Sequence, residues 1–129
     1  MPKPEAVREV PDSRDVAVAA ARAASDKQGS RIVILDVRDL IVITDYFVIA
    51  SGATERQART IVEEVEKACR DLSVKPVRRE GDGEGIWVLL DFVDVVVHVF
   101  REEERDFYDL ERLWSDAPTV EWEEAGAAS

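Results

Sequence analysis

The chain has 129 residues, the size of one domain, and its 28 acidic and 17 basic residues give it a formal net charge of −11. Such a surface repels the phosphate backbone of nucleic acids, which disfavours direct nucleic-acid binding and favours a basic protein partner. A single cysteine excludes an internal disulfide, which suits a reducing compartment. No apolar run approaches the roughly 18 uninterrupted residues of a membrane span. We therefore expect a cytoplasmic protein.

Residues 1–11 form a proline-containing segment of mixed charge that we expect to be a flexible tail. A first helix follows, because Asp12 or Ser13 can cap it and Gly29 can end it. Small apolar side chains recur in it at helical spacing, which indicates close packing. They are Val16, Ala19, Ala20, Ala23 and Ala24.

Two β-branched and aromatic runs, 31–37 and 45–52, are typical of strands, and 38–44 between them suits another strand or an extended link. Thr54 and Gln57, three residues apart, have the form of a capping box at the start of a second helix. The apolar side of that helix consists of Ala58, Ile61, Val62, Val65, Ala68 and Leu72. Its cysteine, Cys69, is predicted to be a buried thiol.

The rest of the chain continues the alternation of strands and helices. Residues 74–77 suit an edge strand because they contain a proline, 80–85 form a glycine-rich turn, and 102–114 form a last helix. The pattern predicts an α/β fold with a mixed β-sheet of about five strands flanked by helices, over residues 12–117. Residues 118–129 are expected to form an acidic tail.

The stretch 87–100, WVLLDFVDVVVHVF, carries two aspartates and the chain's histidine in a run that is otherwise typical of buried strands. A two-residue hairpin loop at 92–93 would place Asp91 opposite Asp94 and Trp87 opposite His98. Because side chains alternate along a strand, the hairpin then has an aliphatic face and a mixed second face. The aliphatic face comprises Ile86, Val88, Leu90, Val95, Val97 and Val99, and the second face comprises Trp87, Leu89, Asp91, Asp94, Val96, His98 and Phe100.

Three interpretations of this second face stay open on the residues alone. Asp91 and Asp94 can be solvated turn residues, with His98 filling space beside Trp87. The two carboxylates can instead bind a divalent cation for nucleotidyl transfer, although only two acids cluster and the chain has no Walker-type glycine loop. In the third interpretation the face docks another protein, with aromatic anchors and an acidic edge that complements a basic partner.

The last predicted helix bears on the same question. One side of this helix carries Phe107, Leu110, Leu113 and Trp114. The simplest interpretation places Phe107, Leu110 and Trp114 in the core, with Trp114 at the boundary between the core and a docking surface. Tyr108 and Glu111, three residues apart, lie on a different side and can extend a docking surface. Enzymatic alternatives are weaker, because no G-x-S-x-G elbow exists and one histidine with one cysteine cannot form a zinc site of the usual spacing.

Five blocks of the sequence together resemble the ribosome silencing factor family, also called Iojap or RsfS, over about residues 12–117. The blocks are TDYFVIASG at 44–52, Gln57, EG at 80–81, the stretch 87–100 and FYDLERLWSDA at 107–117. The resemblance implies a small non-enzymatic α/β protein, without cofactor or metal and distantly nucleotidyltransferase-like in fold. It also implies binding to the large ribosomal subunit through its L-fourteen protein. The resemblance further implies that such binding would sterically block joining of the small subunit and repress translation when nutrients are scarce.

The resemblance also implies docking positions on this chain, and these largely coincide with the second face of the hairpin. They are Trp87, Leu89, Asp91, Asp94, His98, Tyr108, Glu111 and Trp114. The same face is compatible with a homodimer. The chain departs from the family at Val93, where glycine is usual, so a glycine-dependent turn is not expected there, because a β-branched residue resists positive φ.

Overall fold

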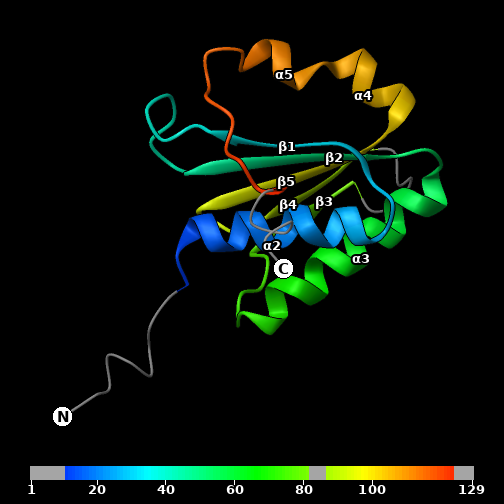
Figure 1. The fold of residues 1–129 in the computed structure, drawn as a ribbon, viewed down its shortest axis with the longest axis horizontal. Helices are drawn as coiled ribbons and strands as arrows, with labels where there is room; N and C mark the ends of the chain where they lie inside the picture. The colour runs from blue at the N-terminus through cyan, green and yellow to red at the C-terminus, as the bar shows by residue number, and fades with distance from the viewer. Residues whose placement is uncertain (1–10, 82–86, 124–129) are drawn as a thin grey trace.

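A computed structural model describes residues 11–81 and 87–123, which fold into three layers with a five-stranded sheet in the middle (Figure 1). The helices are α2 Ser13–Asp26, α3 Glu55–Asp71, α4 Glu102–Tyr108 and α5 Leu110–Leu113. The strands are β1 Ser30–Asp36, β2 Tyr46–Gly52, β3 Arg78–Glu80, β4 Trp87–Asp91 and β5 Val95–Arg101. The α2 and α3 helices cover one face of the sheet, and the short α4 and α5 lie over the other. The predicted α/β fold with a mixed sheet of about five strands is confirmed.

The strands follow the order β1-β2-β5-β4-β3 across the sheet. At its centre β2 and β5 pair in parallel, whereas every other neighbouring pair of described strands is antiparallel. All seven residues of β2 are buried, as expected of a central strand that has packed side chains on both faces. We call the face beneath α2 and α3 the sealed face, because aliphatic side chains of both helices and of the strands fill it.

The two long helices begin as their sequences predict. The Asp12 side chain accepts a hydrogen bond from the Arg14 amide at 2.9 Å and caps α2. At the start of α3 the Thr54 hydroxyl accepts from the Gln57 amide at 3.1 Å, and the Gln57 side-chain oxygen accepts from the Ala53 amide at 2.7 Å. The Cys69 thiol lies inside the sealed face, and burial raises its pKa to about 12. The Thr54 cap and the buried cysteine are therefore confirmed, whereas the Gln57 side chain bonds the amide of the residue before the cap instead of that of Thr54.

Three elements differ from their predictions. Residues 74–77, predicted as an edge strand, are irregular, and the edge strand β3 begins only at Arg78. Residues 38–44 form an irregular loop, so of the two alternatives the chain takes the link and not the strand. The predicted last helix is broken at Asp109, which has a left-handed backbone with φ of 50°, so α4 and α5 present different sides to the sheet. Consequently Phe107, expected in the core, is 79% exposed, and Leu113, placed on the same side of the helix, is 71% exposed, while Leu110 and Trp114 do pack inward.

The segment after Ala117, expected to be an acidic tail, begins as a partner of β1. The Asp36 amide donates to the Pro118 carbonyl at 2.8 Å, and the Val120 amide donates to the Ile34 carbonyl at 2.9 Å. These bonds occupy backbone groups that an edge strand otherwise exposes. Residues 1–10 of the expected N-terminal tail, the glycine-rich turn at 82–85, Ile86 and residues 124–129 lie outside the described residues. Within 11–81 and 87–123 no helix is long and apolar enough to cross a membrane.

Candidate docking site

The β4–β5 hairpin presents a mixed face on the side of the sheet opposite α2 and α3, as predicted. The predicted pairing of its two strands was wrong, because the observed register is shifted by two residues. Leu89 pairs with His98, and Asp91 pairs with Val96. Asp94 is therefore not opposite Asp91 and belongs to the loop. A shift of two residues leaves the alternation of side chains unchanged, which is why the two faces of the hairpin were still assigned correctly. We call the second face, formed by Trp87, Leu89, Asp91, Val96, His98 and Phe100, the docking face.

The hairpin loop is a strained γ-turn centred on Val93. Val93 has a φ of +78°, and the Asp94 amide donates to the Phe92 carbonyl at 3.0 Å. The chain thus adopts the positive φ that a β-branched residue was expected to avoid. One stabilising contact is visible, because the Asp91 carboxylate accepts a hydrogen bond from the Val93 amide at 2.8 Å. Asp91 therefore shapes the turn, while the exposed Asp94 contributes its carbonyl to the amides of Asp45 and Tyr46.

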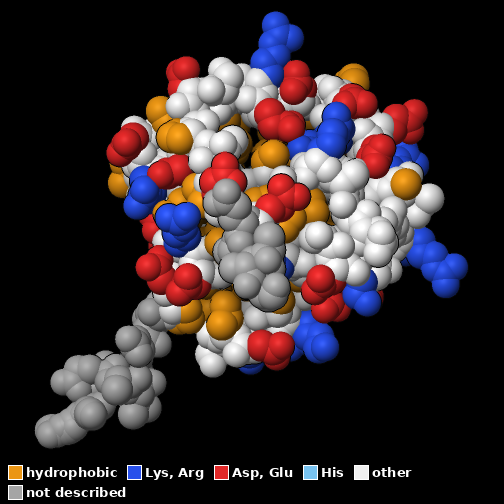
Figure 2. All heavy atoms as spheres, viewed as in Figure 1, with side chains coloured by type: hydrophobic (Ala, Val, Ile, Leu, Met, Phe, Trp, Pro, Cys, Tyr) orange, Lys and Arg blue, Asp and Glu red, His pale blue; other side chains and the backbone are white. Residues whose placement is uncertain are grey.

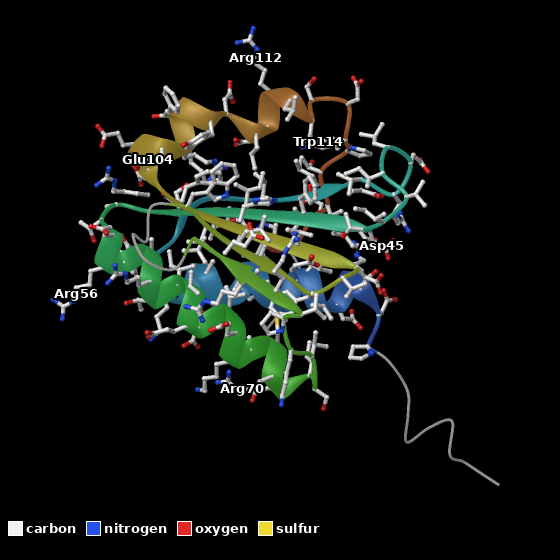
Figure 3. The ribbon with its side chains drawn as sticks, turned by 180° about the vertical axis from the view of Figure 1, so that it is seen from behind. Asp45, Arg56, Arg70, Glu104, Arg112 and Trp114 are labelled. Atoms are coloured by element: carbon white, nitrogen blue, oxygen red, sulfur yellow. The ribbon has the colours of Figure 1, made fainter. Side chains whose placement is uncertain are left out.

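One end of the docking face is partly covered by aromatic side chains. Trp87 stacks on Phe100 with ring centroids 4.9 Å apart, and Tyr108 from α4 lies against Trp87 at 4.6 Å. Trp114 contacts Phe47 of β2 edge-on at 5.3 Å, and Figure 3 shows it between α5 and the sheet. Trp87 nevertheless stays partly exposed, so α4 does not seal it. Trp87, Tyr108 and Trp114 are thereby brought to one face, as the sequence predicted.

His98 occupies the middle of the docking face and is only 6% exposed. Its Nδ1 accepts a hydrogen bond from the Trp87 indole N–H at 3.3 Å, and Phe47 packs edge-on against its ring at 5.2 Å. Burial lowers the pKa of His98 to about 4, so the ring is neutral near pH 7. Because Nδ1 accepts, the proton of the neutral ring is on Nε2. That Nε2 is buried and has no hydrogen-bond partner among the described residues.

Beyond His98 the docking face opens into a cavity of about 350 Å³. Its walls are mostly apolar, with a polar pair at its edge where Arg78 and Asp91 approach to 3.6 Å. The lining consists of Ile41, Ile43, Thr44, Phe47, Arg78, Leu89, Asp91, Val93, Val96 and His98. We call this part of the docking face, where no helix covers the strands, the open half.

Exposed hydrophobic side chains surround the open half. Val42 is fully exposed, and Ile43 and Val93 are more than half exposed at the cavity itself. Large apolar side chains clustered at the surface are typical of a protein-binding site, whereas single ones are not informative. Figure 2 shows hydrophobic side chains at the surface of the molecule between acidic ones. The sequence analysis did not assign the 38–44 loop to the docking face. Its run of four apolar residues at 40–43 is the signal that could have revealed this role.

A buried arginine that the sequence reasoning also missed holds α4 and α5 against the sheet. Arg105 is 1% exposed and donates to both oxygens of Glu111, to the Ser51 hydroxyl and to the Arg31 carbonyl. Its hydrogen bonds to Glu111 keep the pKa of that carboxyl below the ordinary value. Glu111, one of the predicted docking residues, is thus a half-buried anchor of α5.

The arrangement does not favour metal chemistry at the hairpin. Asp91 is engaged by the Val93 amide and by Arg78, and Asp94 lies in the loop instead of facing it. Among the described residues, no three histidine, cysteine or acidic side chains gather closely enough to hold a metal ion. What the face offers chemically is apolar contact, a few hydrogen-bonding groups and an acidic edge.

Comparisons with known proteins agree with the sequence blocks. Residues 10–129 match the family described as "Ribosomal silencing factor during starvation". The ribosomal silencing factor RsfS of Halalkalibacterium halodurans is 42% identical over 104 residues, which cover 81% of this chain and 89% of that protein. A crystal structure from Chromobacterium violaceum superposes with a TM-score of 0.78 at 33% identity, covering 81% of this chain and 88% of that one. "Mitochondrial assembly of ribosomal large subunit protein 1" of Mus musculus is 34% identical over 91 residues, covering 62% of this chain and 40% of that protein.

Proposed function

The chain belongs to the ribosomal silencing factor family, and from this membership we infer how it silences ribosomes. We propose that it docks on the large ribosomal subunit through the L-fourteen protein and that its volume prevents the small subunit from joining. Translation is repressed in this way without any chemical reaction. The protein acts in the cytoplasm, where ribosomes are its target.

The observation that carries this proposal is the incomplete cover of the docking face. Trp87 and Tyr108 offer partly exposed apolar area at one end of the docking face. Leu89 and Ile43 line the cavity at the other end, and the exposed Val42 adjoins Ile43. Protein interfaces combine such aromatic and aliphatic anchors with a polar rim. The proposed contact residues are those predicted from the sequence: Trp87, Leu89, Asp91, Asp94, His98, Tyr108, Glu111 and Trp114. Of these, Glu111 acts through Arg105 by holding α5 in place.

Charge supports a basic protein partner. The net charge of −11 speeds encounter with a basic ribosomal protein and discourages adhesion to ribosomal RNA. An interface of roughly 1,200–2,000 Å² in total is large enough for a stable complex. Steric exclusion then follows from occupied volume alone, so the bound protein needs only to remain attached.

Sedimentation of purified ribosomal subunits through a density gradient tests the proposal. We expect the protein to migrate with free large subunits and to reduce the amount of joined ribosomes when small subunits are added. Purified L-fourteen protein should bind it in calorimetry. Migration with small subunits alone, or with neither subunit, would overturn the proposal.

The docking face is tested by Leu89→Ala, which shortens a partly exposed side chain on the open half. We expect its affinity for large subunits to fall about tenfold, because anchors at the centre of an interface contribute most of the binding free energy. Leu72→Ala is the matched control, since it removes the same atoms from a half-buried leucine that packs against the sealed face. If the two variants bind large subunits with equal affinity, the contact with the ribosome lies outside the open half.

A further inference from the structure

We propose that the cavity on the open half receives a side chain of the docked protein that ends in a carboxamide, an asparagine or a glutamine. The inference rests on the proposed docking function and names the group of the partner that the cavity recognises. Charge complementarity alone predicts only that the partner is basic. The proposed carboxamide adds a neutral group at the centre of the contact between the two proteins.

Two residues that line the cavity each carry a buried side-chain polar atom that has no hydrogen-bond partner in the described part of the chain. Thr44 is 4% exposed and His98 is 6% exposed, and both line the same cavity of about 350 Å³. The Thr44 hydroxyl and the His98 Nε2 are buried, and neither has a hydrogen-bond partner among the described residues. They are the two such side-chain atoms in 11–81 and 87–123. Buried polar groups are nearly always paired, so two orphans in one cavity indicate a ligand that pairs them.

The chemistry of these two groups determines what can pair them. The Trp87 indole donates to His98 Nδ1, so the neutral ring carries its proton on Nε2 and requires an acceptor there. The Thr44 hydroxyl can donate or accept. A carboxamide supplies a carbonyl oxygen for the first group and an N–H donor, or the same oxygen, for the second.

Other side chains match the cavity less well. An ammonium or guanidinium group has no acceptor and leaves His98 Nε2 unpaired. A carboxylate accepts, but burying its charge in a largely apolar cavity is costly, because the Arg78 guanidinium at the edge is already paired with Asp91. A purely apolar side chain leaves both groups unpaired. A hydroxyl offers a single oxygen to two separate groups, whereas the amide offers two polar atoms.

Substitution of Thr44 by valine tests the inference, because it removes the hydroxyl and keeps the shape. Thr44→Val is expected to raise the midpoint of urea unfolding, since an unpaired buried hydroxyl is replaced by a methyl group. The same variant is expected to bind large subunits about fivefold more weakly, since a hydrogen bond to the partner is lost. Thr60→Val is the matched control, because the Thr60 hydroxyl bonds the Arg56 carbonyl on the opposite side of the molecule. Unchanged affinity of Thr44→Val would overturn the inference.

A second measurement does not depend on the ribosome. The full-length protein is titrated with isobutyramide, isobutyrate and isobutylamine, three probes of one carbon skeleton, while the His98 ring nitrogens and the Thr44 amide are followed by NMR. We expect isobutyramide to shift the Nε2 resonance and the two charged probes to leave it unchanged. Equal shifts with a charged probe, or no shift with any probe, would each overturn the inference.

The two measurements separate this inference from the proposed function. If the wild-type protein does not sediment with large subunits, the docking proposal fails, and the probe titration still decides what the cavity accepts. If the wild type does sediment and Leu89→Ala weakens binding, but Thr44→Val and isobutyramide have no effect, the docking proposal stands and the carboxamide assignment fails.

Discussion

On the sealed face of the sheet, two long helices lie over the strands and aliphatic side chains fill the space between them. On the docking face, two short helices and a chain segment cover only part of the strands and leave a cavity at the end of the hairpin. Both unpartnered buried side-chain atoms of the described residues belong to residues that line that cavity. The difference indicates that the sealed face contributes most of the stability, whereas the docking face leaves apolar and polar surface that we propose a second molecule covers.

Two neighbouring residues of β4 test the difference between the two faces most directly. Leu90 is fully buried on the sealed face, and Leu89 points to the open half. We expect Leu90→Ala to lower the free energy of unfolding by about 3–4 kcal/mol, because it leaves a cavity in close-packed core. Leu89→Ala should cost only about 1 kcal/mol, because its side chain is partly in water already. Urea titration measures both, and equal losses would mean that the docking face is as closed as the sealed one.

The partial cover of the docking face depends on Arg105. Arg105→Leu leaves the Glu111 carboxylate and the Ser51 hydroxyl without their donor. We expect the variant to lose about 2 kcal/mol of stability, because the half-buried Glu111 carboxylate, the Ser51 hydroxyl and the Arg31 carbonyl all lose their hydrogen-bond donor. Amide hydrogen exchange should locate the loss in α4 and α5 while α2 and α3 stay protected.

Arg31→Ala is the control for this prediction, because its ion pair with Asp106 lies at the surface. It should cost less than about 1 kcal/mol. Faster exchange in α2 or α3 of the Arg105 variant would show that Arg105 supports the whole fold and not the cover alone.

Acid should weaken the docking face selectively. Burial lowers the pKa of His98 to about 4, from an ordinary value of 6.5. The unfolded chain therefore binds more protons between these two values, and the free energy of unfolding falls as the pH drops from 6.5 toward 4. Between pH 7 and pH 5 we expect His98 to contribute a loss of about 2 kcal/mol.

The contribution of His98 is measured as the difference between the wild type and His98→Phe, which cannot titrate at this position. Carboxylates with lowered pKa values, such as Glu104 and Glu111, are common to both proteins and cancel in the difference. Parallel pH profiles of the two proteins would show that the ring is protonated in the folded state at little cost.

The smallest expected effect concerns the strained turn. Val93→Gly should raise the free energy of unfolding by about 1 kcal/mol, because glycine adopts a φ of +78° without the steric cost that valine incurs. Val77→Gly, at an exposed position with an ordinary backbone, should have the opposite sign. If both variants are destabilised alike, the turn has a different conformation in solution.

Local patterns predicted those parts of the fold that local interactions control. The caps at Asp12 and Thr54, the buried faces of the two long helices and the alternation along the hairpin follow from spacing alone. The hairpin register did not follow, because two loops that differ by two residues give the same alternation. The break at Asp109 was equally hidden, since the apolar spacing across it is that of a continuous helix.

The sequence by itself determined the fold class, the family and the residues of the docking face, because these depend on the order of residue types along the chain. The tertiary structure alone decided which of those residues remain accessible. It brought Thr44 of a loop and His98 of a strand to one cavity and set Arg105 against Glu111. Such contacts join residues that are distant in the chain, and their burial and hydrogen bonding are properties of the packed molecule.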